Sequence, residues 1–167
     1  LNGIAVKSHG GTDAFGFANA IGVAVDMVRY NFISDLKNKI SKNSKNIFLV
    51  HQVHSNRFIF LNKIPRKSEK IKADAIITNL KKLPIAVLTA DCVPVLLYDN
   101  REKIVAVIHA GWKGAIKGII SNVISFMIKK GCSTNVITAV IGPSIAQKSY
   151  EVKNDLRKKF LKKDKGN

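Results

Sequence analysis

The chain has few cysteines, few aromatic residues and few acidic residues. Its 167 residues include two cysteines, Cys92 and Cys132, whereas small secreted scaffolds that depend on disulfides carry more. No run approaches the roughly 20 apolar residues that a membrane-spanning helix needs, and no charged and then apolar leader opens the chain. These absences argue against a disulfide scaffold and a membrane protein. We expect a soluble protein of the reducing cytoplasm.

Acidic residues number 11 against 28 lysines and arginines, which gives a net charge of +17. Such an excess attracts phosphate groups, and it raises the question of nucleic-acid binding. The lysines are spread over segments that read as loops or helix ends, and aromatic residues, which stack on bases, make up only 7% of the chain. We therefore expect most of this charge to be solvated surface and nucleic acid not to be the partner. A nucleic-acid face and anionic small-molecule substrates stay open as alternatives.

The length and the 46% hydrophobic content suffice for one core, so we assign residues 1–167 to a single domain. Because the chain opens on Leu1 and closes on a lysine-rich stretch without a helix or strand signal, we expect it to be incomplete. Apolar spacings of three and four predict helices, and β-branched or continuous apolar runs predict strands, those of 73–109 being buried on both faces. The fold class is therefore α/β: a mixed β-sheet with helices packed on it. The predicted helices cover 20–40 and 112–130, and the predicted strands cover 46–53, 57–61, 73–78, 83–98, 103–109 and 136–141.

Cys92 and His109 are the first candidates for chemistry. Cys92 lies at a break between two apolar runs, where Pro94 removes a donor from the strand ladder, and His109 ends the next run. If these strands are neighbours, a thiolate and an imidazole meet at one edge of the sheet, a pair that suits zinc better than magnesium or calcium. The same residues also fit a buried thiol and a structural histidine, so the spacing leaves both interpretations open.

A third ligand would come from His51 or His54. In a strand these two side chains point in opposite directions, so we expect only one of them to bind the metal. Three protein ligands leave a fourth position for water, whose pKa zinc lowers to roughly 7.

The segment Gly111-Trp112-Lys113-Gly114 opens the second predicted helix. Free backbone N–H groups, the positive end of the helix dipole and Lys113 would together bind a phosphate close to the metal. The glycines could instead serve only close packing of the helix on the sheet.

Four ordered motifs resemble the signatures of the laccase-domain family, formerly called polyphenol oxidases and now regarded as purine nucleoside phosphorylases. They are Gln52-Val53-His54, the run Ala86–Leu96 with Ala90-Asp91-Cys92, Ile108-His109-Ala110-Gly111-Trp112-Lys113-Gly114, and Ile141–Ile145 followed by Tyr150-Glu151-Val152. The resemblance extends from the first glycine loop to Val152.

This resemblance implies zinc bound by His54, Cys92 and His109, and it selects His54 over His51. It also implies phosphorolysis of adenosine and inosine to the base and ribose 1-phosphate, with adenosine deamination as an additional activity. Phosphate would bind at Gly111, Trp112 and Lys113. Cys92, Asp91 and His109 are the catalytic candidates, Asp91 being the nearest carboxylate in sequence.

Three alternatives remain at this point. Two histidines and a cysteine also suit copper, which would make the chain a copper-dependent phenol oxidase. Lys113 replaces the arginine that is common in the family, and the family's C-terminal Phe-Ser-Tyr-Arg-Arg motif is not in the sequence, which fits an inactive basic remnant that binds polyanions. A thiol hydrolase would use Cys92 with His109.

Overall fold

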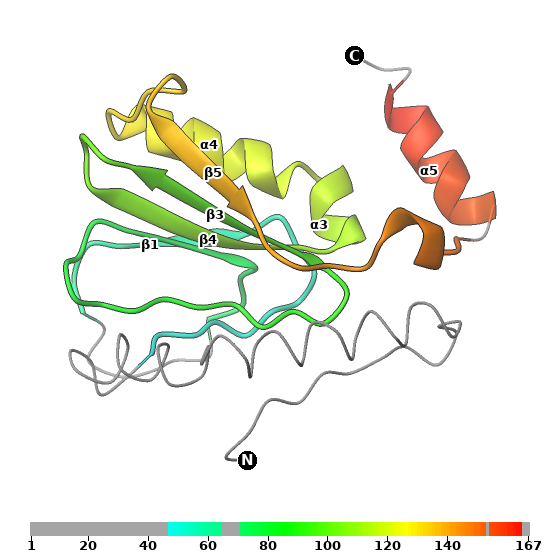
Figure 1. Cartoon of the computed structure of the whole chain (residues 1–167), viewed down its shortest axis with the longest axis horizontal. Coiled ribbons are helices and arrows are strands. Elements are labelled where there is room, and N and C mark those ends of the chain that lie inside the picture. Colours follow the sequence, from blue (N-terminus) through cyan, green and yellow to red (C-terminus); the bar gives the residue numbers. More distant parts are fainter. Residues whose placement is uncertain (1–46, 65–70, 153, 165–167) are drawn as a thin grey trace, which may run out of the picture. The chain divides into compact units, whose positions relative to one another are not determined.

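The computed structural model describes residues 47–64, 71–152 and 154–164 (Figure 1). The chain divides into two compact units, one of residues 1–45 with 146–151 and the other of residues 46–145 with 152–167. The described part of the first unit is 146–151, with the short 3-10 helix η1 (Gln147–Ser149). The predicted helix over 20–40 lies outside the described residues, and the assignment of 1–167 to a single domain stays a prediction.

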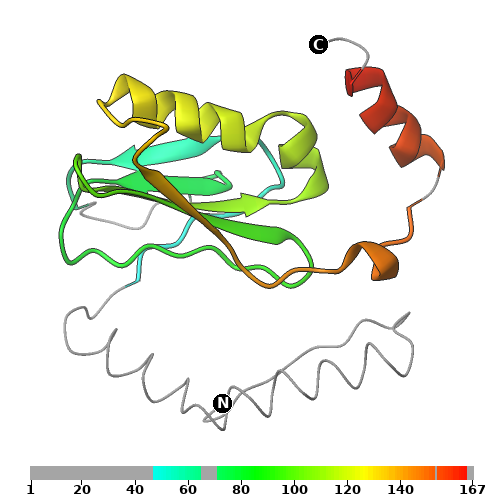
Figure 2. The same cartoon turned by 45° about the horizontal axis from the view of Figure 1, so that its top comes forward.

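The described residues of the second unit form a mixed five-stranded sheet in the order β1-β2-β4-β3-β5 (Figure 2). Among these five described strands, β1 and β2 pair in parallel, and the other neighbours pair antiparallel. The predicted α/β fold with a mixed sheet is therefore confirmed. The strands are β1 (Phe58–Leu61), β2 (Ala75–Thr78), β3 (Val93–Asp99), β4 (Ile104–Ala110) and β5 (Ile137–Ile141).

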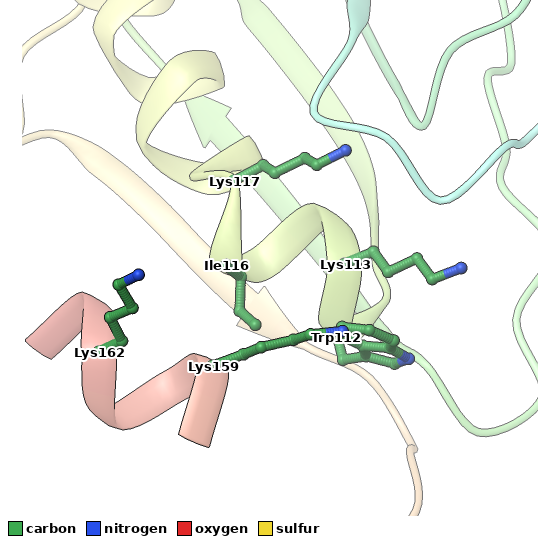
Figure 3. A pocket seen from close by; sticks show the side chains of 6 residues that line it. All are labelled: Trp112, Lys113, Ile116, Lys117, Lys159 and Lys162. Atoms are coloured by element: carbon green, nitrogen blue, oxygen red, sulfur yellow. The ribbon is translucent and has the colours of Figure 1, made fainter. Parts of the chain in front are cut away.

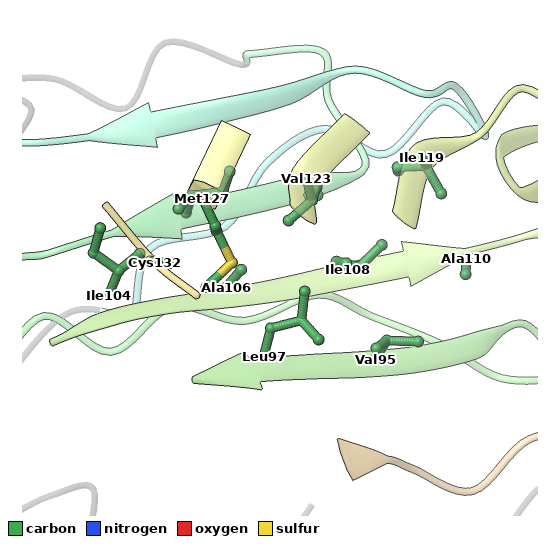
Figure 4. Close-up of a cluster of buried hydrophobic side chains, with 12 residues drawn as sticks. Val95, Leu97, Ile104, Ala106, Ile108, Ala110, Ile119, Val123, Met127 and Cys132 are labelled. Atoms are coloured by element: carbon green, nitrogen blue, oxygen red, sulfur yellow. The ribbon is translucent and has the colours of Figure 1, made fainter. Parts of the chain in front are cut away.

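One face of the sheet carries the main core beneath α4 (Ile119–Lys129). Ile119, Val123 and Met127 recur every fourth residue, so they form one helical stripe, and all three are fully buried. Figure 4 shows this stripe facing alternate residues of β3 and β4. The buried residues of this core are Ala75, Ile77, Val95, Leu97, Ile104, Ala106, Ile108, Ala110, Ile119, Val123, Met127 and Cys132.

The opposite face is covered by irregular chain. Leu61, Ile76 and Val107 are buried there beneath half-buried apolar side chains that include Val50, Leu83 and Val87. Strand β4 is therefore covered on both faces, as its continuous apolar sequence predicts.

Two predicted elements differ from the structure. Residues 47–53, the described part of the first predicted strand, and residues 83–92 do not form continuous strands. They make only the isolated bridges Phe48 to Ile85 and His51 to Lys72. Pro84 has no N–H to donate to a ladder, so the pairing through Pro84 and Ala86 stays local.

The helix predicted over 112–130 is two helices, α3 (Trp112–Ile116) and α4. Gly118 separates them with a φ of +78°, a left-handed conformation that glycine adopts at little cost. A further helix, α5 (Asn154–Asp164), follows near the end of the chain, where the sequence predicted no element. Along the described ranges, no helix combines the length and apolar character needed to cross a bilayer.

Candidate metal centre

His54, Cys92 and His109 meet at one end of the sheet. Antiparallel pairing places Pro94 of β3 opposite His109 of β4, so Cys92, just before β3, lies beside the end of β4. His54 comes from the bend that precedes β1. One potential ligand atom of each residue lies within 4.8 Å of the others, whereas His51 bridges to Lys72 and is not in this group.

The geometry of the three side chains is compact. Nε2 of His54 lies 3.9 Å from Sγ of Cys92, and the two imidazole rings approach edge to face with centroids 4.7 Å apart. His109 is buried, Cys92 is half-buried and His54 is exposed. The cluster therefore joins a buried histidine to a histidine that solvent reaches.

Asp74 fixes His109 from behind. Its Oδ1 lies 2.9 Å from Nδ1 of His109, and the Asp74 side chain is fully buried. Because Nδ1 is hydrogen-bonded to Asp74, Nε2 is the ring nitrogen of His109 that remains available to bind a metal ion. This carboxylate–histidine pair is the arrangement that usually supports a metal-bound histidine.

The same carboxylate fixes the backbone of His54. It accepts hydrogen bonds from the backbone N–H groups of Val53, His54 and Ser55, at 3.2, 2.9 and 2.6 Å, and one from the Ser55 hydroxyl at 2.7 Å. His54 has a φ of +55°, which is uncommon outside glycine. The hydrogen bonds to Asp74 offset the cost of that conformation and direct the imidazole.

Opposing effects act on the pKa of Asp74. Burial raises it, but the hydrogen bonds from His109, Ser55 and His54 outweigh burial, and the pKa lies below the ordinary value of 3.8. Asp74 is therefore a carboxylate anion at neutral pH, in contact with His109 and with the backbone of His54.

The pKa of Cys92 is raised by burial and by the nearby carboxylates of Asp91 and Asp74. The side chain is therefore a thiol unless a cation compensates the charge of the thiolate. A free thiolate nucleophile needs a lowered pKa, so this environment does not favour the thiol hydrolase.

Gly111 leaves space between the three side chains. A Cβ at this position would lie 2.8 Å from Cδ2 of His54 and 3.1 Å from Sγ of Cys92. Its φ of −70° is open to any residue, so the glycine is required by space and not by backbone conformation.

Helix α3 is tied to the bend that carries His54. A Cβ on Gly114 would lie 2.6 Å from the backbone oxygen of Ser55, so only glycine permits this approach. Nδ2 of Asn56 donates to the backbone oxygen of Lys117 at 3.0 Å. The bend is thus held from the side of α3 as well as by Asp74.

The other predicted site residues surround this centre. Asp91 is half-buried and its backbone oxygen accepts from the N–H of Ile145 at 3.1 Å. Trp112 and Lys113 open α3, with Nζ of Lys113 5.5 Å from the centroid of the Trp112 ring. Lys113 is exposed.

Comparison with known proteins places the chain in a family. The family model described as multi-copper polyphenol oxidoreductase laccase matches residues 8–167. The chain belongs to this laccase family. The resemblance found in the motifs is therefore confirmed.

Relatives in the laccase family carry enzyme names. A protein of Rickettsia prowazekii named purine nucleoside phosphorylase is 45% identical over 128 residues, which are 74% of this chain and 50% of the relative. A protein from an unknown prokaryotic organism named adenosine deaminase is 43% identical over 89 residues, which are 53% of this chain and 34% of the relative. The chain spans about half the length of the Rickettsia relative.

Solved structures share the fold. The YfiH protein of Bacillus licheniformis has a TM-score of 0.61 at 30% identity, with 71% of this chain and 49% of that one covered. The protein NMB0706 of Neisseria meningitidis has a TM-score of 0.63 at 25% identity, with 93% of this chain and 56% of that one covered.

The sequence motifs of the laccase family predict neither Asp74 nor the role of Gln52. Gln52 both donates to the backbone oxygen of Leu88 (2.7 Å) and accepts from its N–H (2.6 Å), which links the His54 segment to the segment before Cys92. One sequence feature could have indicated Asp74: it directly precedes the apolar strand β2. A carboxylate buried there is costly unless it has hydrogen-bond partners, so partners were to be expected.

Proposed function

We propose that this chain carries the zinc centre of a purine nucleoside phosphorylase, which cleaves adenosine or inosine with phosphate and also deaminates adenosine. The observation that supports it most is the cluster of His54, Cys92 and His109 around the space left by Gly111. The names of the relatives in the laccase family point to the same reactions.

The residues fit a zinc ion. Two imidazole nitrogens and one thiolate are ligands that zinc prefers, and three protein ligands are typical of a zinc site that keeps a position for substrate. Asp74 holds His109 so that Nε2 is available. Held by these residues, the ion supplies Lewis acidity to the reaction.

The chain's own residues would bind phosphate and manage the proton. In phosphorolysis a phosphate oxygen bonds to C1′ of the ribose while the bond from C1′ to the purine nitrogen breaks, and the base leaves with the electron pair and takes up a proton. Lys113, with the backbone of Gly111 and Trp112, is the proposed phosphate-binding segment, because its ammonium group neutralises the attacking anion. Asp91 is the proposed carboxylate for proton transfer at the base.

The activity is tested by incubating the chain, loaded with zinc, with inosine and phosphate. We expect release of hypoxanthine and ribose 1-phosphate that depends on both phosphate and metal. Absence of hypoxanthine from protein that holds stoichiometric zinc would reject the activity for this chain.

The ligand set is tested by elemental analysis of variants. We expect Cys92→Ser and His54→Ala each to lose stoichiometric zinc, because either change removes one of three ligands. Cys132→Ser and His51→Ala are the matched controls, since they remove the same side-chain types outside the cluster. Stoichiometric zinc in Cys92→Ser or His54→Ala would refute the ligand set.

Copper is the alternative metal, because two histidines and a thiolate also suit it. Stoichiometric copper in the isolated protein, with a visible thiolate-to-copper charge-transfer band and oxidation of a phenol, would replace the phosphorylase proposal by the phenol oxidase.

A further inference from the structure

A pocket lies between α3 and α5, beside Trp112 (Figure 3). Its volume is about 530 Å³, which falls in the range of small-molecule sites. Both helices belong to the same compact unit. The lining residues are Trp112, Lys113, Ile116, Lys117, Lys159 and Lys162.

The sequence explains why lysines gather here. Ile116, the last residue of α3, and Lys117, which follows the helix, come three and four positions after Lys113, so the three side chains lie on one side. On α5, Lys159 and Lys162 are three positions apart and also share a face. Each helix therefore presents a lysine-bearing face to the pocket.

The lining of the pocket combines apolar surface with charged groups. Trp112 and Ile116 are half-buried, and the lysines contribute aliphatic stems below their ammonium groups. Nζ of Lys113 and Nζ of Lys159 lie 5.5 and 5.6 Å from the centroid of the Trp112 ring. Figure 3 shows the Lys159 side chain extending from α5 to this ring.

The charge of the pocket has one sign. Four lysines line it, and no described carboxylate does. Four cations without a described carboxylate among them create a positive potential, which favours an anion. The Trp112 ring also offers a flat surface on which an aromatic ring can pack.

We propose that this pocket binds an anion that carries a flat aromatic ring, of the chemical type of a nucleoside monophosphate. The ring packs on Trp112 and Ile116, and the phosphate is held by the lysines of the two helices. Lys113 is shared with the proposed phosphate-binding segment, whereas Lys159 and Lys162 belong to no part of the proposed active site. The test is therefore built on α5.

Trp112 is the only tryptophan of the chain, so its fluorescence reports the pocket directly. The probe is adenosine monophosphate, titrated into the full chain with the Cys92→Ser change, in which zinc is not expected to bind. Inorganic phosphate and adenosine are titrated separately. Failure of the proposed phosphorylase thus leaves this measurement unaffected.

We expect a saturable fluorescence change with adenosine monophosphate at lower concentration than with phosphate or adenosine. The double variant Lys159→Glu with Lys162→Glu should bind adenosine monophosphate about tenfold or more weakly, because two attractive ion contacts become repulsive. The matched control is Lys63→Glu with Lys81→Glu, which changes the net charge equally at exposed positions outside the pocket and should shift the midpoint less than about twofold.

Three results would overturn the proposal. They are no saturable change, equal weakening in the two double variants, and phosphate binding as tightly as adenosine monophosphate. Equal weakening of binding in the two double variants would mean that net charge alone attracts the ligand. Equal affinity for phosphate and adenosine monophosphate would mean that the aromatic ring contributes nothing to binding. Circular dichroism of both double variants checks that the fold is intact.

Discussion

Asp74 contacts two of the three clustered residues, but through different parts of each. It holds the ring of His109 through Nδ1 and the backbone of His54 through its N–H. A buried carboxylate with this many donors is stable as an anion, and its charge also favours a cation among the ligands. We therefore infer that Asp74 acts by positioning the two histidines.

Replacing Asp74 by asparagine should weaken zinc binding about 10- to 100-fold, because loss of a carboxylate behind a ligand histidine removes both orientation and basicity. A competition titration against a chromophoric chelator measures the affinity. Ser55→Ala is the matched control, since it removes one donor to Asp74 and leaves the carboxylate and both histidines in place. Affinity in Asp74→Asn equal to that of the control would contradict the positioning role.

Gly111→Ala should lose metal affinity by about tenfold or more while the fold is kept. The added methyl group would lie too close to His54 and Cys92, whereas the backbone conformation suits alanine. Chelator competition and urea unfolding measure the two properties on the same preparation. A variant that binds zinc like the wild type would show that the space at Gly111 is not needed.

At the scale of elements, a break separates α3, which carries Lys113, from α4, which covers the core. The direction of α3 is therefore not fixed by the packing of α4. Gly118 permits the break because its φ of +78° suits glycine. A Cβ there would meet nothing within 4 Å, so any cost of substitution comes from the backbone alone.

We therefore expect Gly118→Ala to lower the free energy of unfolding by about 1 kcal/mol, through the strain of a left-handed alanine. Zinc affinity should be unchanged, the opposite of the result for Gly111→Ala. Urea unfolding monitored by circular dichroism gives the free energy. Unchanged stability would mean that the α3–α4 junction adopts another conformation at no cost.

The turn between β3 and β4 depends on Asp99. This buried carboxylate accepts from the N–H groups of Arg101 and Glu102 in the turn and of Ser133 after α4. The hydrogen bond from the N–H of Glu102 lowers the pKa of Asp99, and burial raises it. With the further hydrogen bonds from Ser133 and Arg101, the pKa of Asp99 lies below the ordinary value of 3.8.

Because the folded pKa is depressed, the stability that Asp99 contributes is present above the unfolded value of about 3.9 and is lost as pH falls through the folded pKa. Asp99→Asn should therefore be less stable than the wild type at neutral pH, and the difference should narrow below about pH 4. Thermal unfolding at several pH values checks this. A difference in Tm between Asp99→Asn and the wild type that stays constant across the acid range would contradict the stabilising role of the Asp99 carboxylate.

For the molecule as a whole, metal binding and stability are linked. An ion that binds only the folded chain at 100 times its dissociation constant stabilises by about 2.7 kcal/mol. We expect zinc to raise the Tm of the wild type by several degrees and a chelator to reverse this. Cys92→Ser should show neither change, and an equal rise in that variant would mean that zinc acts elsewhere.

Much of the sheet was predictable because its signal is local. The continuous apolar runs of β3 and β4 specify strands. The expectation that both faces are buried is confirmed for β4 but wrong for β3, because Leu96 and Tyr98 on one of its faces are 48% and 38% exposed. The run over 83–98 was predicted wrongly in its first part, since Pro84 interrupts a ladder that composition alone suggests, whereas the break at Cys92 was predicted. The single helix over 112–130 was wrong because helical spacing continues through Gly118, and periodicity does not register a change of φ.

The candidate ligands were predicted in part. Spacing offered Cys92, His109 and one of two histidines, and the family motifs selected His54, the residue that the structure brings to the cluster. Asp74 was not predicted, because its partners lie 19 to 35 positions away and no local pattern registers them.

The sequence by itself determined the mixed sheet, the family and the residue types available for a metal, since these follow from periodicity and ordered motifs. Only the tertiary structure decided that Asp74 holds His54 and His109, that Gly111 leaves room beside them, and that four lysines from α3, the turn after it and α5 line one pocket. The physical reason is that these features depend on side chains brought together from distant positions, and their distances are set by packing.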